Sequence, residues 1–149
     1  MDRTDTNITD ALAHTVSEIS RTDTKAGLLL TLDGLLVAAL SFLGTDVDGL
    51  ALALAVVGAV ALVGGVVLAL LVIRPRLAAP GQTVSDRAHF GFYATAEPAE
   101  IAEALTGDRR PARLQALSRI ALRKMAQLRR SGDASLIAVI TIAAAILTR

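Results

Sequence analysis

The sequence predicts an all-α membrane protein: an N-terminal helix that continues into a transmembrane hairpin, a cytoplasmic helical segment, and a C-terminal third transmembrane helix. The chain has 149 residues, of which 53% are hydrophobic and only 3% aromatic. Its apolar residues are gathered in three blocks, residues 26–43, 49–73 and 134–148. As helices, these blocks are about 27, 37 and 22 Å long, against about 30 Å for the hydrocarbon core of a bilayer.

The first block begins abruptly after a polar arm, residues 1–25, which ends at Lys25. Eight leucines, one valine and one phenylalanine each favour insertion by about 0.3 to 0.6 kcal/mol, and together they outweigh the cost of about 3 kcal/mol for the only ionisable residue, Asp33. Within the arm, apolar residues recur at helical spacing, and neither proline nor glycine interrupts the chain before the block. We therefore predict one helix through arm and span, capped by Asn7 or Thr9. Its apolar stripe is Ile8, Leu12, Val16 and Ile19.

The second block, residues 49–73, carries no charge, and only the link 44–48 separates it from the first. So short a link predicts an antiparallel hairpin. Ala61, Gly65 and Ala69 recur every four residues, a pattern that lets another helix approach closely. Self-association and chance spacing in an alanine- and glycine-rich span both explain this pattern. The sequence Arg-Pro-Arg at 74–76 ends the span.

Residues 74–133 are polar and predict helices joined by turns. Turn residues mark a loop over 79–86, three of the four aromatic residues lie in 89–93, and a short helix is expected from Glu97 to Thr106. An amphipathic helix follows from Pro111 to about Arg130, and we expect Ser-Gly-Asp at 131–133 to end it. One face of this helix is apolar (Leu114, Leu117, Ala121, Met125 and Leu128) and the opposite face is basic (Arg119, Arg123 and Arg130).

The last apolar block, residues 134–148, is short for a membrane span. It is either a third span, helped by snorkelling of Arg149 and by packing on the hairpin, or a helix lying against the protein or the interface. We favour the span.

The distribution of charge predicts the orientation. Residues 74–133 hold 11 Lys and Arg against six Asp and Glu, and the link 44–48 holds no basic residue. By the positive-inside rule, the N-terminus and residues 74–133 are cytoplasmic in a multi-pass protein of the plasma (inner) membrane. The predicted organisation is a single domain, 1–149: arm 1–25, spans 26–43 and 49–73, helical segment 74–133, and span 134–148.

Enzymatic chemistry is not expected. The chain has no cysteine, His14 and His89 are not at metal-ligand spacing, and no phosphate-binding loop or hydrolase motif is present. Glu97, Glu100 and Glu103 recur every three residues, which is more typical of a solvated helix face than of a metal site. We expect neither a metal nor a resident cofactor.

Four stretches together resemble the Pycsar effector family, PycTM. They are Asp-Thr-Lys-Ala at 23–26 running into the leucine-rich 28–34, the 74–76 sequence, Phe-Gly at 90–91, and residues 117–124. The resemblance covers about residues 10–148. It implies a membrane effector of anti-phage defence that responds to a cyclic pyrimidine mononucleotide, cUMP or cCMP, and impairs the inner membrane. The implied partners are a uridylate or cytidylate cyclase, the bilayer and other copies of the chain, with no nucleic acid polymer.

Two other functions remain open at this point. One is a structural or plasmid-transfer-type integral membrane protein that acts through protein partners without ligand gating. The other is a toxin-like pore without gating.

The two lysines are candidate ligand-binding residues. Lys25 and Lys124 are the only lysines among 15 basic residues, and both lie in stretches that carry the resemblance. A compact ammonium fits beside one anionic oxygen. We therefore hypothesise that they lie near each other and hold a cyclic phosphate or an acidic partner such as Asp23. Snorkelling of Lys25 and chance for Lys124 are the alternative.

Asp33 is a candidate gate or pore residue. An ionisable side chain inside hydrocarbon usually faces a polar interior or a water path. The alternative is a protonated or hydrogen-bonded carboxyl between helices, with Thr31 or Ser41 nearby.

Tyr93, Arg119 and Arg123 complete the tentative ligand-binding residues. Tyr93 and its aromatic neighbours are of the right type to stack on a pyrimidine, although aromatic residues beside a membrane more often anchor at the interface. The arginines suit a nucleotide or lipid phosphates, or form an ordinary solvated face.

Overall fold

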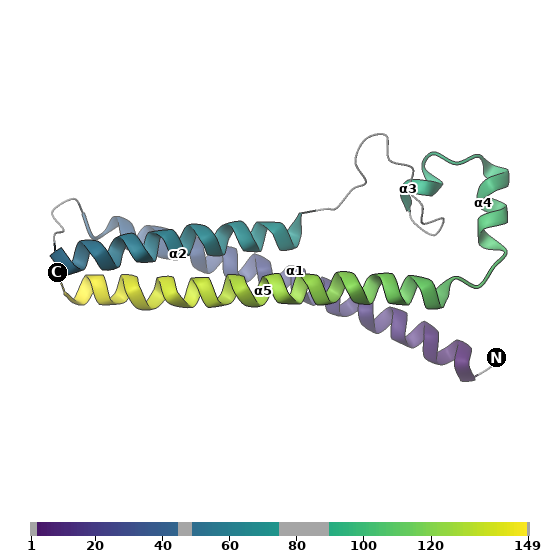
Figure 1. Ribbon diagram of the computed structural model, residues 1–149, viewed down its shortest axis with the longest axis horizontal. Helices are drawn as coiled ribbons and strands as arrows, with labels where there is room; N and C mark the ends of the chain where they lie inside the picture. The colour runs from purple at the N-terminus through teal and green to yellow at the C-terminus, as the bar shows by residue number, and fades with distance from the viewer. Residues whose placement is uncertain (1–2, 45–48, 75–89, 149) are drawn as a thin grey trace. The chain divides into compact units, whose positions relative to one another are not determined.

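The computed structural model describes residues 3–44, 49–74 and 90–148. In these ranges the chain forms five helices and no strand: α1 (Arg3–Ser41), α2 (Gly49–Ile73), α3 (Phe90–Tyr93), α4 (Pro98–Leu105) and α5 (Arg110–Leu147) (Figure 1). Three of them, α1, α2 and α5, are long and apolar enough to cross a membrane. The predicted all-α membrane fold is therefore confirmed. The loop over 79–86, most of the link 44–48, His89 and Arg149 lie outside the described residues.

The helix through the arm and the first span is also confirmed, because α1 is continuous over 39 residues. Its predicted start is wrong: α1 begins at Arg3, so Asn7 and Thr9 lie inside the helix. The Thr9 hydroxyl donates to the carbonyl of Asp5 at 2.9 Å instead of capping an end. The second span agrees with the bounds of α2.

The predicted helix end at 131–133 is wrong. α5 runs without interruption through Ser131 and Gly132 to Leu147. A glycine inside a helix costs about 1 kcal/mol relative to alanine. Packing offsets this cost here, because Ser131 is fully buried and its hydroxyl donates to the carbonyl of Gly65 at 2.9 Å.

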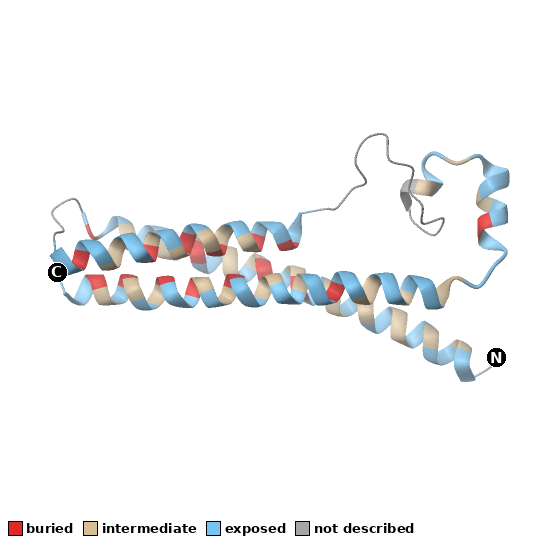
Figure 2. Ribbon diagram, in the orientation of Figure 1, coloured by how far each residue is buried: buried red, intermediate tan, exposed pale blue. Residues whose placement is uncertain are grey.

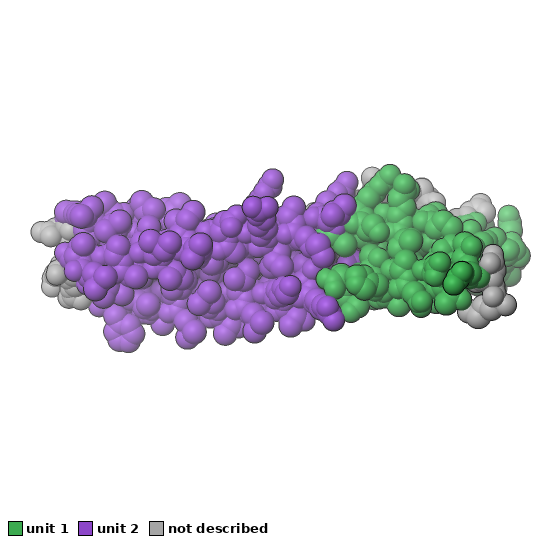
Figure 3. All heavy atoms as spheres, turned by 90° about the horizontal axis from the view of Figure 1, so that it is seen from below, with its two compact units in different colours: residues 1–18, 75–121 green, residues 19–74, 122–149 purple. Residues whose placement is uncertain are grey.

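The chain divides into two compact units, coloured separately in Figure 3. Unit 1 comprises residues 1–18 and 75–121, and unit 2 comprises residues 19–74 and 122–149. Each unit therefore draws on segments that are distant in sequence, and each of α1 and α5 contributes one part to each unit.

Unit 2 is a three-helix bundle whose buried residues follow one stripe on each helix (Figure 2). The stripe residues recur alternately at three and four positions, the heptad spacing of helices that pack side by side. On α5 the stripe runs through Lys124, Leu128, Ser131, Ser135, Ala138, Ile142 and Ala145, and on α2 through Ala51, Ala55, Gly58, Leu62, Gly65, Ala69 and Val72.

Met125 of α5 and Val16 of α1 lie off the buried stripes of their helices, contrary to the prediction. They are 39% and 49% exposed, whereas Lys124 and Thr15 are partly buried. A period of 3.6 residues per turn places positions 125 and 16 on the apolar face, whereas burial along these helices recurs alternately at three and four residues and places positions 124 and 15 there.

Small residues on α2 allow α5 to pack closely against it. A Cβ atom added at Gly58 would lie 2.7 Å from Ile142 Cγ1, and one at Gly65 would lie 3.1 Å from Ser135 Oγ. The small-residue ridge of α2 is therefore covered, at Gly65, by a helix of the same chain.

Candidate functional site

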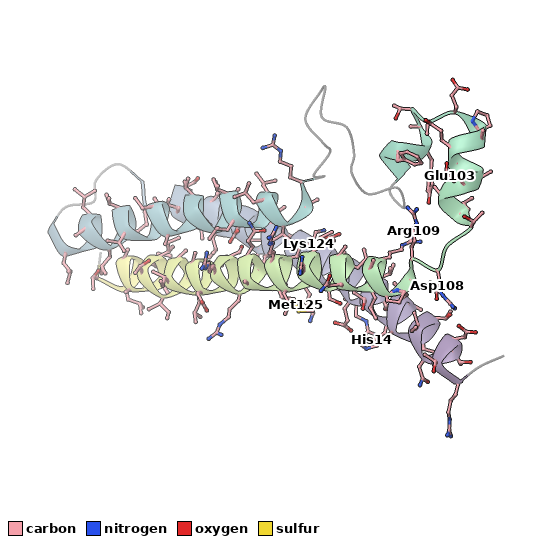
Figure 4. The ribbon with its side chains drawn as sticks, turned by 45° about the vertical axis from the view of Figure 1, so that its right-hand side comes forward. His14, Glu103, Asp108, Arg109, Lys124 and Met125 are labelled. Carbon is pink, nitrogen blue, oxygen red and sulfur yellow. The ribbon has the colours of Figure 1, made fainter. Side chains whose placement is uncertain are left out.

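Unit 1 contains an open cavity of about 440 Å³ at the turn between α4 and α5. This volume lies within the range of small-molecule sites. Arg109 and Asp108, at this turn, are labelled in Figure 4. The lining comes from four places in the sequence: Leu12 of α1, Tyr93 of α3, the end of α4 with its turn (Ala104, Leu105, Thr106, Gly107, Asp108), and the start of α5 (Arg109, Arg110, Arg113).

Local helix chemistry positions this turn. α4 begins at Pro98, and the backbone N–H of Glu97 donates to the carboxylate of Glu100 at 3.2 Å. Two of the three glutamates in the predicted series therefore help to close the helix N-terminus. At the other end, the carboxylate of Asp108 accepts the backbone N–H of Arg110 at 3.0 Å and so fixes the first turn of α5.

Arg110 is held by two carboxylates. Its Nε and Nη2 donate to the two oxygens of Asp108 at 2.9 and 3.0 Å, a bidentate pair, and Nη2 also donates to Asp5 of α1. The hydrogen bond from the Arg110 side chain, followed by that from its backbone N–H, lowers the pKa of Asp108. The side-chain hydrogen bonds to Asp108 and then to Asp5 raise the pKa of Arg110. Arg109 and Arg113 line the cavity beside this cluster, so the rim is rich in guanidinium groups.

Lys124 and Asp23 meet in unit 2. The Lys124 ammonium donates to Asp23 Oδ1 at 2.5 Å, and the two side chains are 20% and 39% exposed. Lys124 occupies a stripe position of α5, so this ion pair joins α1 to α5 within the bundle. Lys25 is exposed and is not a member of the pair.

Asp33 lies in the centre of the bundle with no exposed surface. Its Oδ1 accepts a hydrogen bond from the hydroxyl of Ser135 at 2.8 Å, while its Oδ2 has no partner in the described part of the chain. The Ser135 hydroxyl also lies 3.1 Å from the carbonyl of Ser131. We call Asp33, Ser131 and Ser135, with the Gly65 carbonyl, the buried polar cluster.

The structure brings together some of the predicted residues and separates others. Tyr93 lines the cavity in unit 1, whereas Asp23 and Lys124 pair in unit 2. Arg119 and Arg123 are exposed on α5. Thr31 and Ser41 are not the neighbours of Asp33: their hydroxyls donate to Gly27 and Val37 of their own helix.

Sequence reasoning missed the cavity arginines and both serines. A signal for the arginines is present, since Asp-Arg-Arg-Pro-Ala-Arg at 108–113 places three guanidinium groups in the first turn of a helix. Ser131 and Ser135 are spaced by four and so share one helix face. That spacing went unnoticed because the helix was expected to end between them.

Fold and site define a helical integral membrane protein with three helices long and apolar enough to span a membrane, a buried polar cluster in unit 2, and an arginine-rich cavity in unit 1. A comparison with family models matches residues 7–149 to PycTM, the Pycsar effector protein domain. The chain belongs to this family and is an effector membrane protein of anti-phage defence. Comparisons with curated proteins and with solved structures gave no match.

Proposed function

We propose that the chain binds a cyclic pyrimidine mononucleotide, cUMP or cCMP, in the unit 1 cavity and in response impairs the inner membrane. The observation that supports this most is the chemistry of the cavity, which combines three arginines with one aromatic ring and has a volume of about 440 Å³. In this proposal the chain is no enzyme, and its ligand comes from a partner uridylate or cytidylate cyclase.

The arginines suit the cyclic phosphate. A guanidinium group offers a planar fork of donors to phosphate oxygens, and such charge-assisted hydrogen bonds are about twice as strong as neutral ones. Arg113 is exposed at the cavity. Arg110 is held by Asp5 and Asp108, whose side chains are 43% and 50% exposed. Ion pairs this exposed are weak, so a phosphate competes with them at small cost.

Tyr93 suits the base. Its side chain is 37% exposed, and its ring lies edge-on to Phe92, with ring centroids 6.0 Å apart. A ring face left open beside a cationic rim can stack on a pyrimidine while the arginines hold the phosphate. The hydroxyl of Thr106 and the backbone of Gly107 offer polar contacts at the same cavity.

The proposed orientation puts unit 1 in the cytoplasm, where the ligand would be made. The positive-inside rule supports it, because residues 74–133 carry most of the basic residues of the chain.

The buried polar cluster is the proposed gate. Asp33 Oδ2 is buried and has no partner among the described residues, which costs free energy in the closed bundle and would be relieved by contact with water. Rearrangement of the bundle, in one copy or in an assembly of copies, would expose the carboxylate and open a polar path. In the closed state, Ser135 balances this tendency by donating to Oδ1.

Ligand binding is tested by calorimetry on the full chain in detergent micelles, with cUMP and cCMP. Arg110→Ala and Arg113→Ala should each weaken binding about 10- to 100-fold, because each removes charge-assisted hydrogen bonds of about 1.5–3 kcal/mol. Arg119→Ala and Arg123→Ala are matched controls, since both arginines are exposed on the same helix and neither lines the cavity. Equal losses in the controls would remove the site from the cavity, and a wild-type chain that binds neither nucleotide would refute the proposal.

The response is tested by dye entry into cells that express the chain. Entry should follow addition of the nucleotide that binds, and Arg113→Ala should suppress it. Entry that is independent of nucleotide would instead favour an ungated pore.

A further inference from the structure

The three spanning helices do not become polar at the same depth. The contacts within unit 2 fix their relative register: Asp23 pairs with Lys124, Asp33 pairs with Ser135, and Gly58 lies against Ile142. Residue 25, after which α1 becomes apolar, therefore lies at the same depth as residue 126 of α5. The end of α2, at residue 73, lies at nearly the same level, near residue 125.

On α5 the charged residues continue past this level. Arg129, Arg130 and Asp133 lie about 5–12 Å further into the span, at 1.5 Å per residue. At the same depth α1 and α2 present exposed apolar side chains, among them Leu28 and Val67, which are 66% and 50% exposed. The hydrophobic belt of the bundle is therefore shorter along α5 than along its two neighbours.

These charges face outward. Arg129, Arg130 and Asp133 are exposed, and they lie on the side of α5 opposite the buried Ser131 and Ser135. With Met125 and Ala126 they line an open hollow of about 520 Å³. Charged residues at membrane depth normally face a bundle interior or water, so a basic patch on the outer face needs polar groups supplied from outside the bundle.

We propose that Arg129 and Arg130 bind the phosphate groups of phospholipids and draw the adjacent leaflet down along α5. Helical side chains lean toward the helix N-terminus, which on α5 is the polar end, so both guanidinium groups point toward the headgroup layer. Their planar forks match phosphate oxygens. The short apolar run of α5, about 22 Å against a core of about 30 Å, is then matched by local thinning of the bilayer.

This inference requires only that the chain spans a membrane and is independent of nucleotide binding. It assigns to the outer face of α5 a lipid site that weakens the bilayer on one side of the bundle. A second copy seated on the same face is the competing occupant.

The test uses spin labels on single cysteines, which the cysteine-free chain allows. Labels at Ala126→Cys on α5 and at Leu71→Cys on α2 lie at nearly the same level, and both residues are exposed. In vesicles of phosphatidylcholine with phosphatidylglycerol, their depths are measured with lipid-soluble and water-soluble relaxing agents. We expect the label at 126 to lie shallower than that at 71 by about one helical turn, about 5 Å.

The double variant Arg129→Gln with Arg130→Gln should abolish this difference. Its helical content and its recovery in the membrane fraction show that it folds and inserts. Equal depths of the two labels in the otherwise wild-type chain, or a difference that survives the double variant, overturns the proposal. Dipolar broadening between labels at 126 of different molecules overturns it as well and assigns the face to a second copy.

Discussion

The Asp33–Ser135 hydrogen bond joins two residues, and we expect substitutions of the two to affect the stability of the bundle differently. Ser135→Ala takes away the partner of Asp33 Oδ1 and leaves a fully buried carboxyl with no partner there. Asp33→Leu instead removes the buried polar group, and the Ser135 hydroxyl keeps the carbonyl of Ser131 as acceptor. The two variants therefore separate the cost of an unpaired carboxyl from the simple loss of a contact.

Ser135→Ala should lower the free energy of unfolding by about 1–3 kcal/mol, and Asp33→Leu should leave it unchanged or raise it. In cells, Ser135→Ala should admit dye without nucleotide, whereas Asp33→Leu should stay sealed with it. Unfolding in mixed micelles and dye entry are the measurements. Ser41→Ala is the control, because that exposed hydroxyl bonds only its own helix. Changes in the same direction for both variants would contradict the proposed gate.

At the scale of single residues, the sequence predicted most where burying a charged side chain in an apolar segment costs free energy. A carboxyl in hydrocarbon indicates a polar surrounding, and Asp33 lies buried against Ser135. Of the hypothesis for the two lysines, the structure contains the contact between Lys124 and Asp23, and Lys25 is not part of that ion pair. The identity of the Asp33 partner was beyond reach, because Ser135 is 102 residues away and only the register of α1 against α5 brings them together.

At the scale of helices, the contact between α2 and α5 depends on the absence of side chains. An added Cβ at Gly58 would lie 2.7 Å from Ile142 Cγ1 and 2.8 Å from Thr141 Oγ1, whereas one at Gly64 would meet nothing within 4 Å. These two glycines of one helix thus form a matched pair, one at the contact and one away from it.

Gly58→Ala should destabilise the bundle by about 1–3 kcal/mol through overpacking. Gly64→Ala should be neutral or stabilising by up to about 1 kcal/mol, because alanine favours a helix more than glycine does. Thermal unfolding followed by circular dichroism in detergent measures both. Similar effects of the two substitutions would mean that α2 and α5 do not approach each other as described.

The positions of the long helices were predicted well from the sequence. Their ends and their buried faces were predicted less well. The span 49–73 agrees with α2 because a run of uncharged residues leaves no other boundary. The helix end predicted at 131–133 is wrong because Ser131, although polar, is buried in the packing of the bundle, and α5 continues past it to Leu147. Met125, predicted on the apolar face of α5, is exposed, and Lys124 takes the buried position instead, because burial in the bundle repeats every 3.5 residues.

At the scale of the whole molecule, the proposed orientation predicts which residues a reagent outside the cell can reach. The chain has no cysteine, so single cysteines report their own surroundings. Phe42→Cys, at the end of α1, should react with a membrane-impermeant maleimide applied to intact spheroplasts. Ala102→Cys, on α4, should react only after lysis. Both residues are exposed, so side-chain burial does not limit either reaction. Labelling of Ala102→Cys in intact spheroplasts would invert the proposed topology.

The number of spans was predictable for the whole molecule, and the division into two units was not. Hydropathy indicates three apolar blocks, and the structure places each in a helix long and apolar enough to cross a membrane. The cavity draws on Leu12, Tyr93 and Arg113, which come from three separate stretches of sequence. Residue spacing within each stretch does not indicate that the three stretches line one cavity.

The two glycines of α2 at its contact with α5, Gly58 and Gly65, also determine how firmly the helices are held along their length. Gly58 and Gly65 are seven residues apart, so the contact face of α2 offers two similar notches about 10 Å from each other. Between the two notches, Leu62 of α2 packs against Ala138 and Ile142 of α5. What distinguishes the observed alignment is the hydrogen bond from Ser131 to the Gly65 carbonyl, together with the fit of Ile142 over Gly58. A slide by one notch would carry Gly58 and Leu62 away from Ile142 and break the Ser131 hydrogen bond, so this contact resists axial sliding as well as separation of the helices.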